Sequence, residues 1–112
     1  MKMNDTTSAG LPGTPTGELL RERCSELVAA GKRLGATNLR VFGSAARGDD
    51  EPSSDIDILV DLSPTVTLVG LGRLEEDFEA ILQRKVDVVP ASGLKPGIRE
   101  QVLHEAVPLE SA

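Results

Sequence analysis

Two short apolar segments hold the residues that could carry out chemistry. The first ends in Gly43 and Ser44, and after ten further residues the second begins with Asp55-Ile-Asp57-Ile. Because side chains alternate between the faces of a strand, Asp55 and Asp57 share one face, about 7 Å apart along the strand. If the carboxylates approach to about 5 Å, they repel by about 3 kcal/mol at an effective dielectric near 20. A hard cation such as Mg²⁺, which prefers oxygen ligands, relieves this repulsion, so the pair predicts a metal site.

The glycine-serine turn adds a second kind of group to this region. Backbone N–H groups in a turn led by Gly43 can bind phosphate oxygens, and Ser44 follows it directly. Arg47 could also bind a phosphate, or it could pair with Asp49 or Asp50 at the surface. Together the turn and the two aspartates predict a site for a metal-bound nucleoside triphosphate.

A third carboxylate, Asp87, lies in the apolar segment 85–89. If this segment forms a strand beside that of Asp57, the two carboxylates can meet. Three carboxylates around one or two Mg²⁺ ions suit in-line nucleotidyl transfer, because one metal lowers the pKa of the attacking hydroxyl and the other stabilises the leaving pyrophosphate. Asp87 is then the candidate general base. A single charge on a half-exposed strand is also common, so a structural role for Asp87 stays open.

The patterns around these residues predict a small mixed β-sheet with helices packed on it, an α/β (α+β) fold. Thr14 is the expected cap of a first helix that starts at Pro15. The last helix is expected to turn Ile98, Val102 and Ala106 inward. The predicted helices begin at residues 15, 68 and 96; the predicted strands are 39–42, 55–62, antiparallel to the first, and 85–89.

Composition sets the remaining limits. Residues 1–14 are rich in Thr, Ser, Gly and Pro and predict a flexible tail, which leaves residues 15–112 as a single domain. The acidic run 49–51 is expected to be a solvated loop. The net charge of −6 and the presence of only two aromatic residues argue against direct nucleic-acid binding. No apolar run is long enough for a signal peptide or a membrane span, so we expect a cytoplasmic protein.

The motifs resemble those of a known superfamily. The string Gly43-Ser44-Ala-Ala-Arg-Gly, followed by Asp55-Ile-Asp57-Ile-Leu-Val and Lys-Val-Asp87, is similar to the signature of DNA polymerase β-type nucleotidyltransferases, and in particular of the minimal nucleotidyltransferases (MNT proteins). The resemblance covers about residues 39–109 and implies the polymerase β-like nucleotidyltransferase fold. It also implies that Gly43 and Ser44 hold the triphosphate, that Asp55 and Asp57 bind both metals, and that Asp87 completes the catalytic triad.

The resemblance further implies a function. MNT proteins are often encoded beside a HEPN-domain ribonuclease toxin and act as its antitoxin. The implied reaction is Mg²⁺-dependent transfer of AMP from ATP to a tyrosine of that toxin. Two alternatives stay open: an antitoxin that neutralises its toxin by binding alone, and nucleotidyl transfer to RNA or to a small molecule.

Overall fold

The computed structural model describes residues 10–109; residues 1–9 and 110–112 lie outside the described part of the chain. A four-stranded mixed sheet forms its centre, with the strand order β3-β2-β1-β4. β2 is antiparallel to β1 and parallel to β3, and β4 is antiparallel to β1. The predicted fold class is confirmed. The strands are β1 (Ala36–Phe42), β2 (Ile56–Leu62), β3 (Val86–Pro90) and β4 (Val107–Pro108); the helices are α1 (Pro15–Arg33), α2 (Ser44–Arg47), α3 (Leu68–Leu82) and α4 (Pro96–Glu105), with a 3₁₀ turn η1 (Ala91–Gly93).

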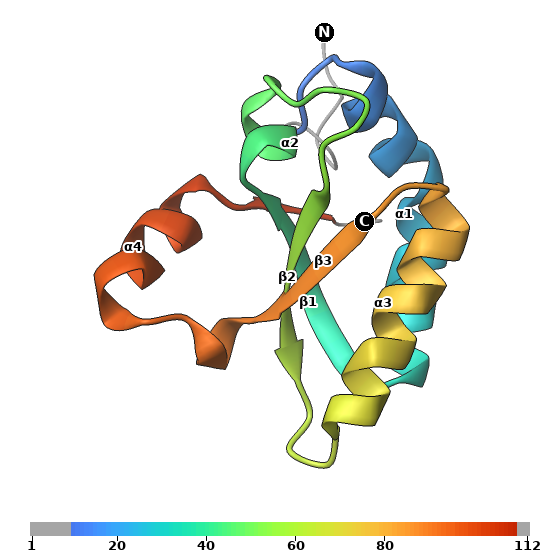
Figure 1. Ribbon diagram of the computed structural model, residues 1–112, viewed down its shortest axis with the longest axis vertical. Helices are drawn as coiled ribbons and strands as arrows, with labels where there is room; N and C mark the ends of the chain where they lie inside the picture. The colour runs from blue at the N-terminus through green and yellow to red at the C-terminus, as the bar shows by residue number, and fades with distance from the viewer. Residues whose placement is uncertain (1–9, 110–112) are drawn as a thin grey trace, which may run out of the picture.

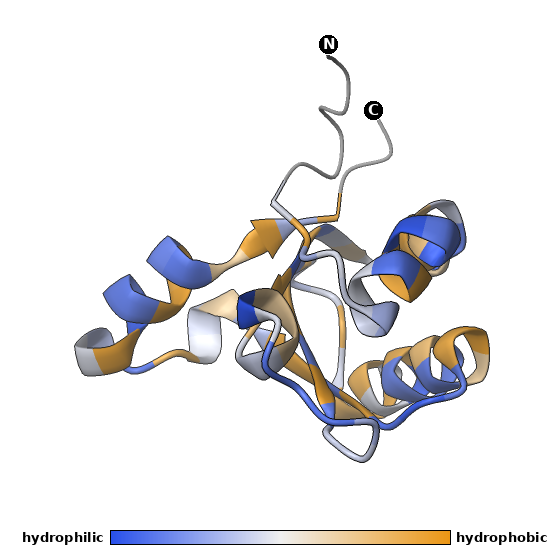
Figure 2. Cartoon of the chain, turned by 90° about the horizontal axis from the view of Figure 1, so that it is seen from above, coloured by the Kyte–Doolittle hydropathy of each residue, from blue (hydrophilic) through white to orange (hydrophobic). Residues whose placement is uncertain are grey.

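The helices are distributed unequally over the sheet. Helices α1 and α3 lie side by side against one face, whereas η1 and α4 lie on the other side (Figures 1 and 2). The core fills the space under α1 and α3, because Ile56, Ile58 and Val60 of β2 are fully buried there with Leu20 and Phe78. This one-sided packing leaves the opposite face, which carries Asp57, only partly covered. No helix within residues 10–109 is long and apolar enough to cross a membrane.

Helix α1 begins as the sequence predicts. The Thr14 hydroxyl accepts a hydrogen bond of 3.0 Å from the Gly17 N–H, and Pro15 occupies the first turn. The last residues of the predicted flexible tail, however, are packed against the folded domain. Leu11 is 5% exposed, and Arg21 donates to the carbonyls of Leu11 (2.8 Å) and Pro12 (3.1 Å). The packed part of the chain therefore starts before Thr14, while residues 1–9 of the predicted tail lie outside the described residues.

The C-terminal part of the fold departs from the prediction in two ways. Helix α4 starts at Pro96 as expected but buries none of its residues, and Ile98 is 51% exposed, because the helix projects away from the core. The predicted inward face of this helix is therefore wrong. The apolar end of the chain forms β4, and Leu109 is buried. A two-residue strand is too short to give a recognisable alternation of apolar and polar positions.

Two glutamates of α3 complete the edge strand β3. The Val86 N–H donates to Glu79 Oε2 at 3.1 Å, and the Val88 N–H donates to Glu75 Oε2 at 3.0 Å. These backbone groups face away from β2, where an edge strand has no neighbouring strand to accept its hydrogen bonds. The α3 carboxylates therefore serve in place of a fifth strand.

We expect Glu79→Ala to lower the free energy of unfolding by about 1–2 kcal/mol, because the Val86 N–H loses a charged acceptor next to a buried side chain. Urea denaturation monitored by circular dichroism measures this loss. Glu76→Ala is the matched control, since Glu76 is exposed on the same helix. Equal stability of the two variants would show that Glu79 contributes nothing to the edge.

Candidate active site

The turn after β1 brings Gly43 directly against Asp57. Phe42, the last residue of β1, is the register partner of Asp57 on β2. Gly43 has φ +74°, and a Cβ at this position would lie 2.5 Å from Asp57 Oδ2. The positive φ strains any residue with a Cβ, and a side chain here would also displace the Asp57 carboxylate, so the turn favours glycine.

The strand pairing also brings the third predicted aspartate to the site. Asp57 and Asp87 are register partners in the parallel pair β2–β3, so their side chains leave the same face of the sheet. Burial raises the pKa of Asp57 above its usual value, the charges of Asp87 and Asp55 raise it further, and Arg47 acts in the opposite sense. Asp57 is thus the inner member of an acidic group, and the more exposed Asp55 and Asp87 flank it.

These three carboxylates are the candidate metal ligands. Carboxylate oxygens are the ligands that Mg²⁺ and similar hard cations prefer. As the side chains stand, no group of three or more His, Cys, Asp or Glu residues in the described chain is arranged to hold a metal ion. Asp55 and Asp87 are exposed and can change rotamer toward Asp57, so the donor types and the shared face fit a divalent cation.

The predicted phosphate-binding turn caps a short helix. Gly43 is the N-cap of α2, and its carbonyl accepts hydrogen bonds from the N–H groups of Ala46 and Arg47, each at 3.1 Å. Gly48 ends the helix with φ +85°. This tight geometry places Ser44 at the first helical position, beside the Gly43 N–H group.

A residue that the sequence does not single out contacts this turn. Glu105, at the end of α4, accepts a hydrogen bond from the Gly43 N–H at 3.1 Å through Oε1. Its Oε2 accepts from Arg47 Nη1, also at 3.1 Å, while Arg47 Nε donates to Asp49 at 3.3 Å. The hydrogen bond to Glu105, followed by that to Asp49, raises the pKa of Arg47. Arg47 therefore forms the predicted surface pair with Asp49, and it also pairs with Glu105.

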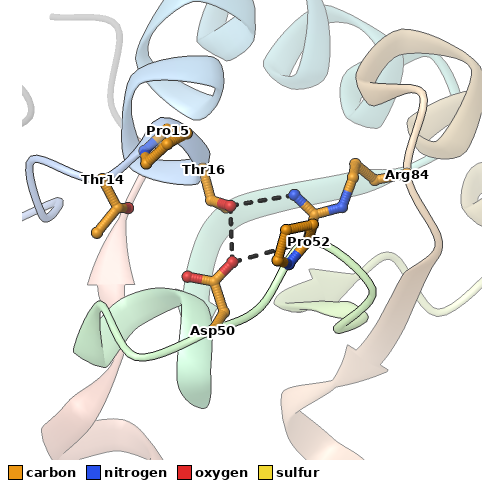
Figure 3. Close-up of a pocket in the computed structure, with 6 residues that line it drawn as sticks. All are labelled: Thr14, Pro15, Thr16, Asp50, Pro52 and Arg84. Carbon is orange, nitrogen blue, oxygen red and sulfur yellow. Dashed lines mark hydrogen bonds and ion pairs between the residues drawn. The ribbon is translucent and has the colours of Figure 1, made fainter.

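A partly buried ion pair fixes the loop that leads into Asp55 (Figure 3). The Thr16 hydroxyl donates to Asp50 Oδ2 at 2.6 Å, and Arg84 Nη2 lies 3.6 Å from the same oxygen. Arg84 also donates to Thr16 Oγ1 at 3.0 Å and to the Ser54 carbonyl at 2.8 Å. The side chain of Asp50 is only 4% exposed, so the expectation of a solvated acidic loop is wrong for this residue. The loop is tied to α1 and to the start of β3, and this anchors the chain just before Asp55.

Comparison with known proteins decides the family. A model of the nucleotidyltransferase domain matches residues 18–109. Over 76 residues the chain is 45% identical to the protein adenylyltransferase MntA of Thermococcus cleftensis, covering 68% of this chain and 77% of that protein. A solved structure considered to be a minimal nucleotidyltransferase superposes with a TM-score of 0.75 at 44% identity, covering 81% of this chain and 93% of that chain. This chain belongs to the MNT family.

The MNT assignment confirms the predicted resemblance and makes the chain an enzyme of the nucleotidyltransferase class. The same fold occurs in a solved complex of the tri-AMPylated HEPN toxin of Shewanella oneidensis with an MNT antitoxin. There the TM-score is 0.59 at 21% identity, and the match covers 85% of this chain and 72% of that chain. At this identity the likeness concerns the fold alone.

Proposed function

We propose that this MNT protein transfers AMP from Mg²⁺-bound ATP to a tyrosine hydroxyl of a cognate HEPN-domain ribonuclease toxin and thereby acts as an antitoxin. The observation that carries the proposal is the meeting of Asp57, Asp87 and the Gly43 turn at one point of the sheet. The similarity to a protein adenylyltransferase and the MNT–HEPN complex support the choice of nucleotide and acceptor.

Each site residue has a role in this proposal. Asp55, Asp57 and Asp87 would hold Mg²⁺, which would lower the pKa of the attacking hydroxyl and neutralise charge on the leaving pyrophosphate. The Gly43 N–H, Ser44 and Arg47 orient the triphosphate. The tyrosine oxygen bonds to the α-phosphorus, the bond to the bridging oxygen of the β-phosphate breaks, and Asp87 accepts the hydroxyl proton.

The openness of the site supports a macromolecular acceptor. Asp55 and Asp87 are exposed, so a hydroxyl on another protein can reach them. Large apolar side chains are also exposed on two helices, at Leu68 (86%) and Val69 (77%) of α3 and at Ile98 (51%) of α4. Only Leu68 and Val69 are neighbours in the chain, and scattered apolar side chains are normal on a protein surface, so the support for a protein acceptor comes from the exposed carboxylates.

The test uses the purified chain, α-labelled ATP, Mg²⁺ and the proposed cognate HEPN protein. We expect label on the HEPN protein, with a mass gain of one or more AMP units on tyrosine, and none with the Asp55→Asn, Asp57→Asn double variant. Equal transfer by wild type and double variant would refute the assignment of the site. If the double variant transfers nothing but still protects cells from the toxin, neutralisation occurs by binding alone.

A further inference from the structure

Glu105 accepts hydrogen bonds from two groups that, in the proposed function, bind the triphosphate. Its two carboxylate oxygens accept from the Gly43 N–H and from the Arg47 guanidinium, each at 3.1 Å. A carboxylate and a phosphate present the same kind of acceptor oxygen to these donors. One backbone N–H cannot bond fully to both, and the two anions repel each other.

The attachment of α4 to the site depends on this contact. Helix α4 buries none of its residues, and among its described side chains the hydrogen bonds to the rest of the protein come from Glu105. The chain after the helix is held separately, because Val107 and Pro108 of β4 pair with β1. Glu105 can therefore leave the turn while β4 keeps its place in the sheet.

We propose that Glu105 is an internal competitor for the triphosphate: it binds the same groups that would bind phosphate, and ATP must displace it and release the end of α4. This inference rests on the proposed function, since it takes Gly43 and Arg47 to be phosphate-binding groups. It adds to that function a residue that sets nucleotide affinity and a link between nucleotide binding and the position of α4.

Binding measurements test the competition. Isothermal titration calorimetry with ATP and Mg²⁺ should show about tenfold tighter binding by Glu105→Ala than by wild type, since one charge-assisted competitor is removed. Glu105→Gln should fall between them, because an amide still accepts from Gly43 but loses the charge pairing with Arg47. Glu100→Gln is the matched control: it changes the net charge by the same amount from an exposed position on the same helix, and its affinity should equal that of wild type.

Hydrogen exchange gives a second readout that does not depend on affinity. In wild type, ATP with Mg²⁺ should speed amide exchange in residues 96–105, and in Glu105→Ala exchange there should already be fast without nucleotide. Unchanged or weaker ATP binding by Glu105→Ala, with wild type still binding ATP, would overturn the competitor role and leave the proposed function intact. A wild-type protein that neither binds ATP nor transfers AMP would instead overturn the proposed function.

Discussion

Asp57→Asn is expected to abolish nucleotidyl transfer and, in the same molecule, to stabilise the metal-free protein at neutral pH. Activity should fall about 1,000-fold or more, because loss of a metal ligand removes several kcal/mol of transition-state stabilisation. Stability and Tm should rise, since the variant no longer holds a partly buried charge beside Asp55 and Asp87. Added Mg²⁺ should stabilise wild type and leave the variant unchanged.

The pH dependence of this difference follows from the raised pKa of Asp57. The folded state holds the Asp57 proton more tightly than the unfolded state does. Its contribution to stability is therefore fully present below the usual aspartate pKa of about 4 and is lost as pH rises through the raised value. The gain in stability of Asp57→Asn over wild type should accordingly be absent in acid. It should grow as pH rises from the usual to the raised pKa of Asp57, and it should stay constant above that value. Thermal melts across the range measure it.

Asp61→Asn is the control, because Asp61 lies on the same strand and its pKa is shifted in the opposite direction. The Asn38 amide, at 2.9 Å, and Arg40, at 2.8 Å, both donate to the Asp61 carboxylate and lower its pKa. This variant should lose stability at neutral pH, and the loss should disappear as the solution is acidified through the lowered pKa. If both variants shift Tm in the same direction at pH 7, repulsion among the site aspartates is not the cause.

Asp50→Ala is expected to cost about 3 kcal/mol of unfolding free energy. The Asp50 side chain is 4% exposed and that of Arg84 is 18% exposed, so the variant leaves a cation poorly solvated and without its carboxylate. Removal of one partner from a buried ion pair typically costs about 3–5 kcal/mol. The lower end applies because Arg84 keeps its hydrogen bond to the Ser54 carbonyl. Urea titration should show a lower midpoint with an unchanged m-value.

Asp49→Ala is the comparison variant, because it removes the neighbouring ion pair at the surface and leaves the Asp50–Arg84 pair intact. Asp49 pairs with Arg47 at 3.3 Å, but its side chain is 63% exposed, so its loss should cost less than about 1 kcal/mol. Recovery of stability in an Asp50→Ala, Arg84→Leu double variant would identify the unpaired guanidinium as the source of the loss. Equal effects of the Asp49 and Asp50 substitutions would contradict the account.

The features of the fold that could be predicted from the sequence depend on local spacing. Asp55 and Asp57 are two residues apart, and alternation along β2 places the isoleucines that follow each of them in the core. The starts of α1 at Pro15 and of α3 at Leu68 were also predictable, because caps and apolar periodicity are local signals. The assignment of Asp55, Asp57, Asp87, Gly43, Ser44 and Arg47 to catalysis, metal and nucleotide remains a prediction for the experiments above.

The features that the sequence did not reveal depend on contacts between distant residues. Glu105 lies 62 residues from Gly43 in the chain, and in sequence it is one more glutamate in a polar helix. The burial of Asp50 depends on Thr16 and Arg84, each 34 residues away. The first part of β1 also escaped prediction, because the strand is irregular at Asn38, which has φ +54°.

The glutamates of α3 also bear on how other molecules can attach to the sheet. A strand from another chain that approached β3 would find the outward amides of Val86 and Val88 already engaged. The opposite border, β4, has only two residues, and Pro108 has no amide hydrogen to offer. Within the described residues, β3 and β4 are therefore poor templates for β-augmentation. Recognition of this protein by a partner is therefore expected to proceed through side chains on its helices and loops.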